Sequence, residues 1–381
     1  MEKVEIKQLK GKKKTIRIDF RYAWWHFNPE NNILINLLRK DYNVILDKEK
    51  PDYVFYSVYD HKRPVNSKTF GSIGRKIEKC FPNLYRILRE IYYFKRERWK
   101  MPTIKGNFVK IFFTVENALP KMDKCDWAFT NEYDEELKHP RHMRISNYTF
   151  YTLENPKDLI KGKNYNPEKI LKEKSKFCAF ICSNDVNFRN KFFKQLCKYK
   201  KVESWGKVLN NMGRDIPKTV EIDGDVRLKK ATKKFVPGDF LKQYKFIIAF
   251  ENASRAGYTS DRKIEPMLAN TIPIYWGNPL IHREFNTKSF VNYHDFEREI
   301  KKNTPKILFE IPFIDWLAKR YIERKTFKKM IRRIIEIDNN DELYKEYLKQ
   351  PWYNDNKPSK HLDKELIRRR LGEIIESPRR K

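Results

Sequence analysis

Several ionisable side chains stand at the start of a predicted helix, directly after the polar turn that follows a buried strand, in the segment 246–262. Ser260 suits the N-cap of that helix. A helix N-terminus presents unpaired N–H groups and partial positive charge, which suit a phosphate group. Arg262 and Lys263 add full positive charge there, and the Asp261 carboxylate suits a pair of ribose hydroxyls. The pattern therefore predicts an anion site outside the carboxyl ends of the strands of an α/β sheet.

Two residues of this region constrain its backbone. Gly257 allows the turn to approach a ligand closely. Pro266 falls near the sixth helical position, where it removes a backbone hydrogen bond, so we expect it to kink the helix or to force a later start. From these residues alone, an ordinary strand–turn–helix connection with surface charges remains the alternative interpretation.

The same region resembles the donor-site signature of the α-1,3-fucosyltransferases of glycosyltransferase family 10. Phe250-Glu-Asn252, Tyr258 and Ile272-Pro-Ile-Tyr-Trp-Gly277 match the family pattern directly. Thr259-Ser-Asp-Arg262 stands where the family has Val-Thr-Glu-Lys, so Arg still supplies a cation while Asp is one methylene shorter than Glu. Lys263 and Pro266 also depart from the family's usual apolar and small residues.

Two shorter segments extend the resemblance, which covers roughly residues 105–300. In Asn187-Phe-Arg-Asn190 the Arg falls where the family binds the donor diphosphate, and in Phe113-Thr-Val-Glu-Asn117 the Glu falls where the family places a general base. The resemblance thus implies Glu116 as the catalytic base and no metal-binding residue. It implies donor-binding roles for Arg189, Asn252, Tyr258, Asp261 and Arg262.

The activity implied is inverting transfer of L-fucose from GDP-β-L-fucose to the 3-hydroxyl of GlcNAc in an N-acetyllactosamine-like glycan. Such glycans include Lewis-type surface polysaccharide and lipopolysaccharide. No cofactor would be tightly bound, and a divalent metal would at most stimulate. A family relative with another linkage, such as α-1,4, or another GDP-sugar stays open, and so does a non-catalytic carbohydrate-binding protein.

The charge balance raises a different class of function. The chain has 381 residues and a formal net charge of +32, which favours polyanionic partners. Its Lys and Arg residues are spread from end to end, and no helix-turn-helix, RRM or zinc signature is present. A nucleic-acid-binding protein is therefore the weaker alternative, and we expect no nucleic-acid partner.

The alternation of strands and helices predicts an α/β protein of the GT-B type, with two Rossmann-like domains facing each other across a cleft. We expect an acceptor domain over 1–160 with an insertion at 59–105, a donor domain over 170–312, and a basic helical C-terminal region over 313–381. The expected strands are Thr15–Phe20, Tyr53–Ser57, Lys110–Thr114, Asp126–Thr130, Lys176–Ser183, Val202–Gly206, Tyr244–Phe250, Thr271–Gly277 and Phe290–His294, with helices over Asn32–Leu38 and Asn187–Lys198.

The segment 313–337 is a predicted helix rich in Lys and Arg. It could lie on an anionic membrane surface, helped by the basic tail, or it could be a solvated face of a packed helix. We expect its apolar face to consist of Leu317, Tyr321, Phe327, Met330, Ile331, Ile334 and Ile335. No apolar run approaches 18 residues, no signal peptide is visible, and five cysteines suggest no disulfide framework. We therefore expect a cytoplasmic protein, peripheral on the inner face of the membrane.

Three other features invite a chemical interpretation. Asp223-Gly-Asp225 resembles a metal–nucleotide motif, although two Asp at this spacing are common by chance. His26 beside Trp24-Trp25 could line an acceptor pocket, but the Trp pair is better explained as core. His142 and His294 lack spaced partners and are not credible metal ligands.

Overall fold

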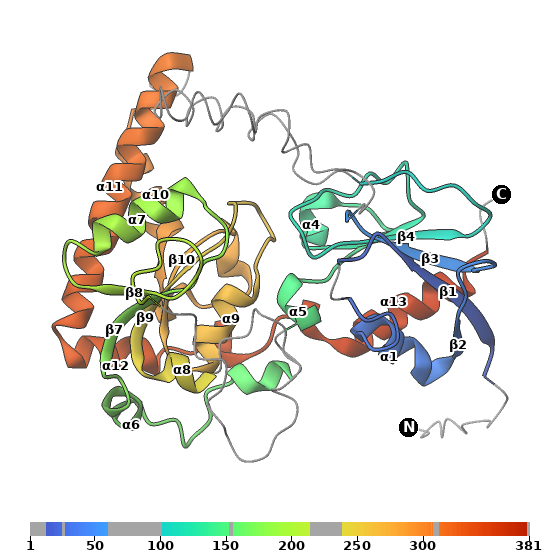
Figure 1. Cartoon of the computed structure of the whole chain (residues 1–381), viewed down its shortest axis with the longest axis horizontal. Helices are drawn as coiled ribbons and strands as arrows, with labels where there is room; N and C mark the ends of the chain where they lie inside the picture. Colours follow the sequence, from blue (N-terminus) through green and yellow to red (C-terminus); the bar gives the residue numbers. More distant parts are fainter. Residues whose placement is uncertain are drawn as a thin grey trace, which may run out of the picture. The chain divides into compact units, whose positions relative to one another are not determined.

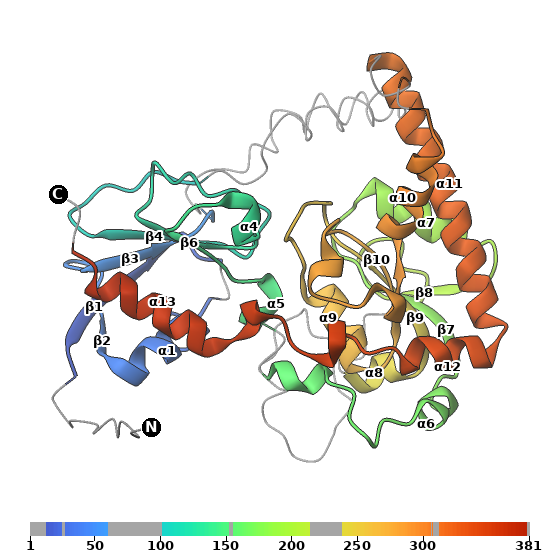
Figure 2. The ribbon, with the colours of Figure 1, turned by 180° about the vertical axis from the view of Figure 1, so that it is seen from behind.

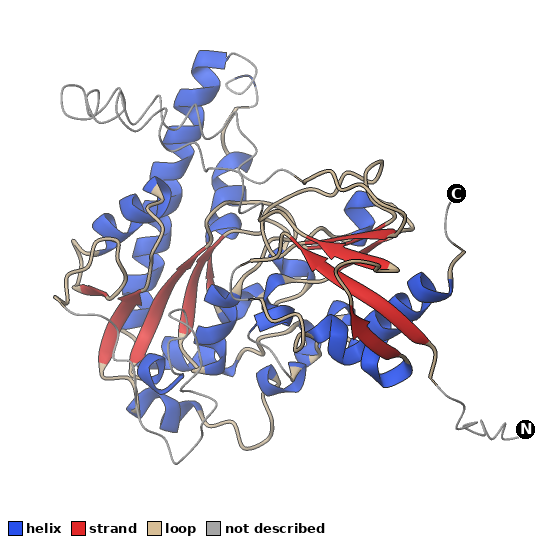
Figure 3. Ribbon diagram, turned by 45° about the vertical axis from the view of Figure 1, so that its right-hand side comes forward, coloured by secondary structure: helices blue, strands red, loops and turns tan. Residues whose placement is uncertain are grey.

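The computed structural model describes residues 13–24, 27–59, 101–151, 155–213, 238–305, 307 and 312–378. The chain divides into two compact units, Met1–Ile145 with Asp363–Lys381, and Ser146–Leu362. Each unit contains one parallel sheet with helices on its faces (Figures 1 and 3). The segment 313–381, which we expected to be a region of its own, is divided at residue 363 between the two units.

The first unit contains a six-stranded sheet in the order β2-β1-β3-β4-β5-β6, and all neighbouring strands are parallel. The strand order reverses between β1 and β3. The β3 strand is buried at every position, as expected for a parallel sheet covered on both faces. The strands are β1 (Thr15–Arg21), β2 (Asn43–Leu46), β3 (Tyr53–Tyr56), β4 (Val109–Phe113), β5 (Trp127–Thr130) and β6 (His142–Arg144).

Helices from opposite ends of the chain pack together in this unit. The α1 helix (Ile33–Asp41) begins after Asn32, whose side chain accepts hydrogen bonds from the Leu34 and Ile35 N–H groups. The α13 helix (Lys364–Glu376) packs beside α1 (Figure 2), and Arg368 pairs with Asp41 at 2.7 Å. The short α4 helix (Asp134–Leu137) precedes β6. The C-terminal segment therefore completes the first unit.

The second unit contains a five-stranded parallel sheet in the order β11-β10-β9-β7-β8. Its strand order reverses between β7 and β9. The strands are β7 (Lys176–Phe180), β8 (Val202–Ser204), β9 (Tyr244–Phe250), β10 (Ile272–Trp276) and β11 (Val291–Asn292). All five strands were predicted from apolar runs, which confirms the α/β class and the expected Rossmann-like architecture.

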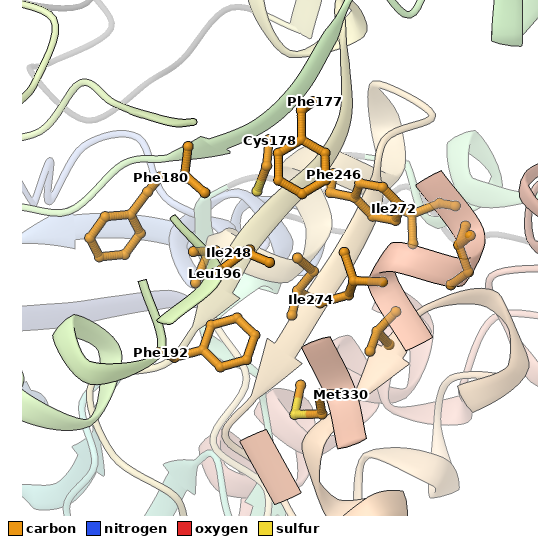
Figure 4. Close-up of a cluster of buried hydrophobic side chains, with 14 of the residues drawn as sticks. Phe177, Cys178, Phe180, Phe192, Leu196, Phe246, Ile248, Ile272, Ile274 and Met330 are labelled. Carbon is orange, nitrogen blue, oxygen red and sulfur yellow. The ribbon is translucent and has the colours of Figure 1, made fainter. Parts of the chain in front are cut away.

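Two apolar clusters cover this second sheet. One joins strand side chains to α7, α11 and α12, as Figure 4 shows for Phe192, Leu196 and Met330. The other joins the sheet to α8 and α9. The helices are α5 (Asn147–Tyr151), α6 (Pro167–Lys172), α7 (Asn187–Leu196), α8 (Gly238–Lys242), α9 (Asp261–Leu268), α10 (Tyr293–Lys302), α11 (Pro312–Asp338) and α12 (Asp341–Lys349). Short 3-10 helices lie at Pro156–Leu159, Ile281–Arg283, Thr287–Ser289, Asn354–Asn356 and Lys360–Leu362.

A buried ammonium group ties several of these elements together. Lys174 is 9% exposed, and its Nζ donates to the Lys242 carbonyl at 2.8 Å and to the Ala269 carbonyl and Thr271 Oγ1 at 3.3 Å. These contacts hold the ends of α8 and α9 beside the start of β10. Burial lowers the pKa of Lys174 from its ordinary 10.5 to about 7.

Between these two pKa values the unfolded chain binds more protons than the folded chain, so stability should rise with pH. We expect the wild type to gain up to about 1.4 kcal/mol per pH unit over Lys174→Met in this window. Urea unfolding of both proteins at several pH values above neutrality measures the difference. Lys172→Met, at an exposed position two residues away, is the control and should give a curve parallel to the wild type. A parallel curve for Lys174→Met would mean that the ammonium keeps its ordinary pKa.

Candidate functional site

The carboxyl ends of β7 and β9 lie beside each other where the order of the second sheet reverses. Doubly wound sheets bind ligands at such a reversal, because the loops after the two strands diverge there and leave a crevice. Cys182 and Asn184 follow β7, and Glu251 and Asn252 follow β9. The segment that carries the sequence signature therefore begins at the place where this fold binds ligands.

Glu251 joins the end of β9 to the start of α9. Its carboxylate is fully buried and accepts hydrogen bonds from the Ser260 N–H and the Ser260 hydroxyl, both at 2.7 Å. Burial raises the pKa of the Glu251 carboxyl, and Arg262 and the Ser260 hydrogen bonds oppose this rise. A Cβ atom at Gly277 would lie 2.3 Å from Glu251 Cγ, so the signature Gly leaves room for this carboxylate.

Arg189 lies at the third position of α7 and is fully buried. Its Nε donates to the Glu251 carbonyl at 2.9 Å, one terminal nitrogen to Asn252 Oδ1 at 2.6 Å, and the other to Cys182 Sγ at 3.0 Å. Burial lowers the pKa of the Arg189 guanidinium, and the Arg262 charge lowers it further. A guanidinium has five N–H groups, and these contacts use three of them.

Asp261 and Arg262 are the first two residues of α9. Ser260 caps the helix as predicted, accepting from the Arg262 N–H, and Asp261 Oδ1 accepts from the same N–H at 3.1 Å. The Arg262 guanidinium lies 3.9 Å from Glu251 Oε2, and its side chain is 25% exposed. Burial opposes its charge, yet Asp261 and Glu251 keep the pKa of Arg262 above the ordinary value. The structure thus places two guanidinium groups, Arg189 and Arg262, beside a helix N-terminus, an arrangement that suits a diphosphate.

The loop between β9 and α9 is held from its other side by Asn278. This fully buried side chain accepts from the Gly257 N–H at 2.9 Å and donates to Thr259 Oγ1 at 3.3 Å. Gly257 has a φ of +83°, a conformation that favours glycine. Tyr258 is only 3% exposed. The loop is therefore positioned by protein contacts alone, with the Tyr258 ring inside the fold.

Glu116 lies in the first unit. It stands two residues after Thr114, which directly follows the carboxyl end of β4. The Thr114 hydroxyl accepts from the Glu116 N–H at 3.1 Å, and Asn131 donates to the Glu116 carbonyl at 3.2 Å. Tyr59, after β3, donates its hydroxyl to the Glu116 carboxylate. Trp24 packs against Phe113 at 5.8 Å between ring centroids and is 8% exposed, so it belongs to the core.

The structure thus brings Arg189 and Asn252 into contact and places Asp261 and Arg262 one loop away, whereas Glu116 belongs to the other unit. Of the two effects expected of Pro266, the later start does not occur, because α9 begins at Asp261 and contains Pro266. Sequence reasoning missed Glu251 as an individual residue, although it stands in the matched tripeptide. It also missed Asn278 and Tyr59, for which no local signal exists.

Among the described residues, no three His, Cys, Asp or Glu side chains gather into a group that could hold a metal ion. His142 binds Thr130 and Asp134, and His294 contacts the Gly277 carbonyl at 3.1 Å. His26 and the motif 223–225 lie outside the described residues, as does most of the expected insertion at 59–105.

Comparison with known proteins bears on this site. Residues 171–306 match the family model described as glycosyltransferase family 10 (fucosyltransferase), C-terminal. The chain is 28% identical over 280 residues to the α-(1,3)-fucosyltransferase FucT of Helicobacter pylori, covering 62% of the chain and 54% of that protein. It is 28% identical over 170 residues to GDP-fucose protein O-fucosyltransferase 3 of Danio rerio, covering 43% of the chain and 32% of that protein. The chain thus spans about half the length of the H. pylori relative and about a third of the length of the Danio rerio relative.

A crystal structure of an α1,3-fucosyltransferase with GDP-fucose superimposes on 99% of this chain and 95% of its own, with a TM-score of 0.62 and 22% identity. This likeness concerns the fold, which is GT-B. The second unit contains a glycosyltransferase family 10 domain, and the chain is a homologue of the α-1,3-fucosyltransferases of that family.

Proposed function

We propose that this protein transfers L-fucose from GDP-β-L-fucose to a glycan. The observation that carries the proposal is the pair of guanidinium groups, Arg189 and Arg262, beside the N-terminus of α9 where the second sheet reverses its order. Anionic phosphates suit such a place because two full charges and unpaired N–H groups converge there. The relatives are named as an α-(1,3)-fucosyltransferase and a GDP-fucose protein O-fucosyltransferase, and these names support fucose as the transferred sugar.

The donor residues have distinct roles in this proposal. Arg189 and Arg262 hold the diphosphate, Asp261 binds the ribose, Asn252 orients the Arg189 guanidinium, and Tyr258 supports the loop from within. As the bond between C1 and the diphosphate oxygen breaks, charge develops on GDP, and the two arginines stabilise it. Because these cations can neutralise the leaving group, we expect the reaction to proceed in the presence of EDTA.

The acceptor half of the reaction requires a base. Glu116 removes the proton from the acceptor hydroxyl as its oxygen attacks C1 from the face opposite to GDP, which inverts the configuration. We propose the 3-hydroxyl of GlcNAc in an N-acetyllactosamine-like surface glycan as acceptor, and the α-(1,3) linkage in the name of the H. pylori relative supports a 3-hydroxyl. A protein hydroxyl is the second candidate, because a protein O-fucosyltransferase is among the relatives. We place the reaction at the cytoplasmic side of a membrane.

GDP release from GDP-fucose, with and without N-acetyllactosamine, tests the proposal, with GDP-mannose and UDP-galactose as donor controls and EDTA present. We expect GDP to be released only when the acceptor is present. GDP-fucose should support this reaction, whereas GDP-mannose and UDP-galactose should not. Binding of GDP-fucose without turnover would exclude this acceptor. No binding of GDP-fucose would mean that the departures at 259–262 have changed the donor.

A further inference from the structure

The described residues from Ile307 to Tyr321, which include the beginning of α11, carry an unusual concentration of exposed apolar side chains. Seven large apolar side chains are exposed among the described residues, and four of them lie between positions 307 and 321. Single exposed apolar residues are ordinary, whereas a cluster marks an interaction surface. The four are Ile307, Trp316, Leu317 and Tyr321, with Tyr321 52% exposed.

These side chains do not belong to the face with which α11 packs on its own unit. That face consists of Ala318, Ile322, Phe327, Met330 and Ile334, all buried. Of the apolar face that the sequence predicted, Leu317 and Tyr321 are therefore exposed, whereas Phe327, Met330 and Ile334 are buried. In Figure 1 the N-terminal end of α11 runs past α7 and α10, and the end of α10 lies beside Leu317 and Tyr321.

Positive charge continues directly from this apolar cluster. A pocket of about 720 Å³ lies between the end of α10 and α11, with Leu317 and Tyr321 at one end. Lys325, Lys328 and Arg332 line its other end, at the spacing that places residues on one stripe of a helix. None of the described acidic groups forms an ion pair with these three side chains, whereas the neighbouring Lys329 pairs with Glu299.

A basic side chain lies over each of the two aromatic rings of the cluster, Trp316 and Tyr321. The Arg320 guanidinium lies 4.7 Å from the Trp316 ring centroid, and the Lys325 ammonium lies 5.3 Å from that of Tyr321. Such pairs suit a boundary between apolar and aqueous phases, because the ring enters the apolar side while the cation stays at the anionic surface.

We propose that Trp316, Leu317 and Tyr321 insert into the surface of an anionic lipid bilayer, with a lipid phosphate in the pocket between Lys325, Lys328 and Arg332. A bilayer fits better than nucleic acid, because apolar wedge and cationic pocket occur together on one helix side. No described helix is long and apolar enough to cross a membrane, so the helix would lie along the surface. Of the basic tail, Arg368 is engaged by Asp41 and Glu365 and is no part of this surface.

This proposal does not depend on the proposed sugar transfer, because α11 contributes none of the residues assigned to the donor. Its test is co-sedimentation of the full chain with phosphatidylcholine vesicles, with and without phosphatidylglycerol, at low and high salt. We expect binding only to the anionic vesicles, and weaker binding at high salt because exposed charges are screened. Each basic residue near such a surface contributes on the order of fivefold in partitioning.

Two variants and a matched control separate the surface from net charge. Lys325→Gln with Lys328→Gln and Arg332→Gln should weaken partitioning by roughly a hundredfold. Trp316→Ser with Leu317→Ser and Tyr321→Ser should also weaken it, without any change in charge. The control changes three exposed lysines of the same unit, Lys163, Lys169 and Lys172, to Gln and should bind as the wild type does.

Thermal unfolding should be the same for all of these proteins, since the changed side chains are exposed. Equal loss of binding in the control would overturn the proposal, because net charge alone would then explain the attraction. Wild-type binding that is equal for neutral and anionic vesicles, or absent from both, would overturn it as well. So would vesicle binding unchanged by the Trp316, Leu317 and Tyr321 substitutions.

Discussion

Glu116→Gln should lower the rate of fucose transfer by roughly 10²–10⁴-fold while leaving the affinity for GDP-fucose almost unchanged. Glutamine keeps the shape of the side chain and can still contact Tyr59, but it cannot take a proton. The side chain lies in the first unit, whereas the donor residues lie in the second, so donor binding should not change. Single-turnover transfer and calorimetric titration of GDP-fucose measure the two quantities separately.

Two further variants make this experiment decisive. Glu49→Gln makes the same chemical change at an exposed position of the same unit and should behave as the wild type. Tyr59→Phe removes the hydroxyl that donates to the Glu116 carboxylate, so it should lower kcat by about tenfold without affecting donor binding. Glu116→Gln with a wild-type rate would place the base elsewhere.

Arg189→Lys should weaken binding of GDP by roughly 10–100-fold, which is the second largest effect that we expect. The Lys ammonium keeps the charge, but it cannot reproduce the planar contacts to the Glu251 carbonyl, Asn252 and Cys182. Guanosine lacks the diphosphate, so its weaker binding should be unaffected by the substitution. Calorimetric titration with GDP and with guanosine therefore isolates the phosphate contribution.

The same position also has a structural role that can be measured independently. Arg189→Met removes the donor to the Glu251 carbonyl and leaves Asn252 Oδ1 with only the longer contact from Asn184, which should destabilise the unit by about 1–3 kcal/mol. Arg324→Lys, at an exposed position of the same unit, is the control for both measurements. Unchanged GDP affinity in a folded Arg189→Lys protein would contradict a phosphate-binding role.

The elements that the sequence predicted share a local cause. The strands β3, β7, β9 and β10 are buried on both faces, so they occur as continuous apolar runs that can be recognised without their neighbours. The start of α9 was predicted for the same reason, because the cap by Ser260 involves an N–H only two residues away. Pro266 did not delay this start, because it removes a single N–H at the sixth of the eight residues in Asp261–Leu268.

The elements that were missed depend on distant partners. The β2 and β6 strands have only four and three residues, and only pairing with β1 and β5 makes them strands. The C-terminal helix α13 joins the first unit through contacts with α1, more than 300 residues earlier in the chain. On α11 the spacing of apolar residues correctly predicted a helix. It could not show that Leu317 and Tyr321 are exposed, whereas Phe327, Met330 and Ile334 are buried.

The sequence by itself determined the α/β class, the main strands and the chemical types gathered around residues 250–262, because these follow from short-range patterns of polarity. Tertiary structure decided that Glu251 connects β9 to Ser260, that Asn278 holds the loop at Gly257, and that Tyr59 donates to Glu116. Each of these contacts joins residues between 9 and 57 positions apart. Such contacts form only after the parallel strands have assembled, because strand order, and not the spacing of residues along the chain, determines which loops become neighbours.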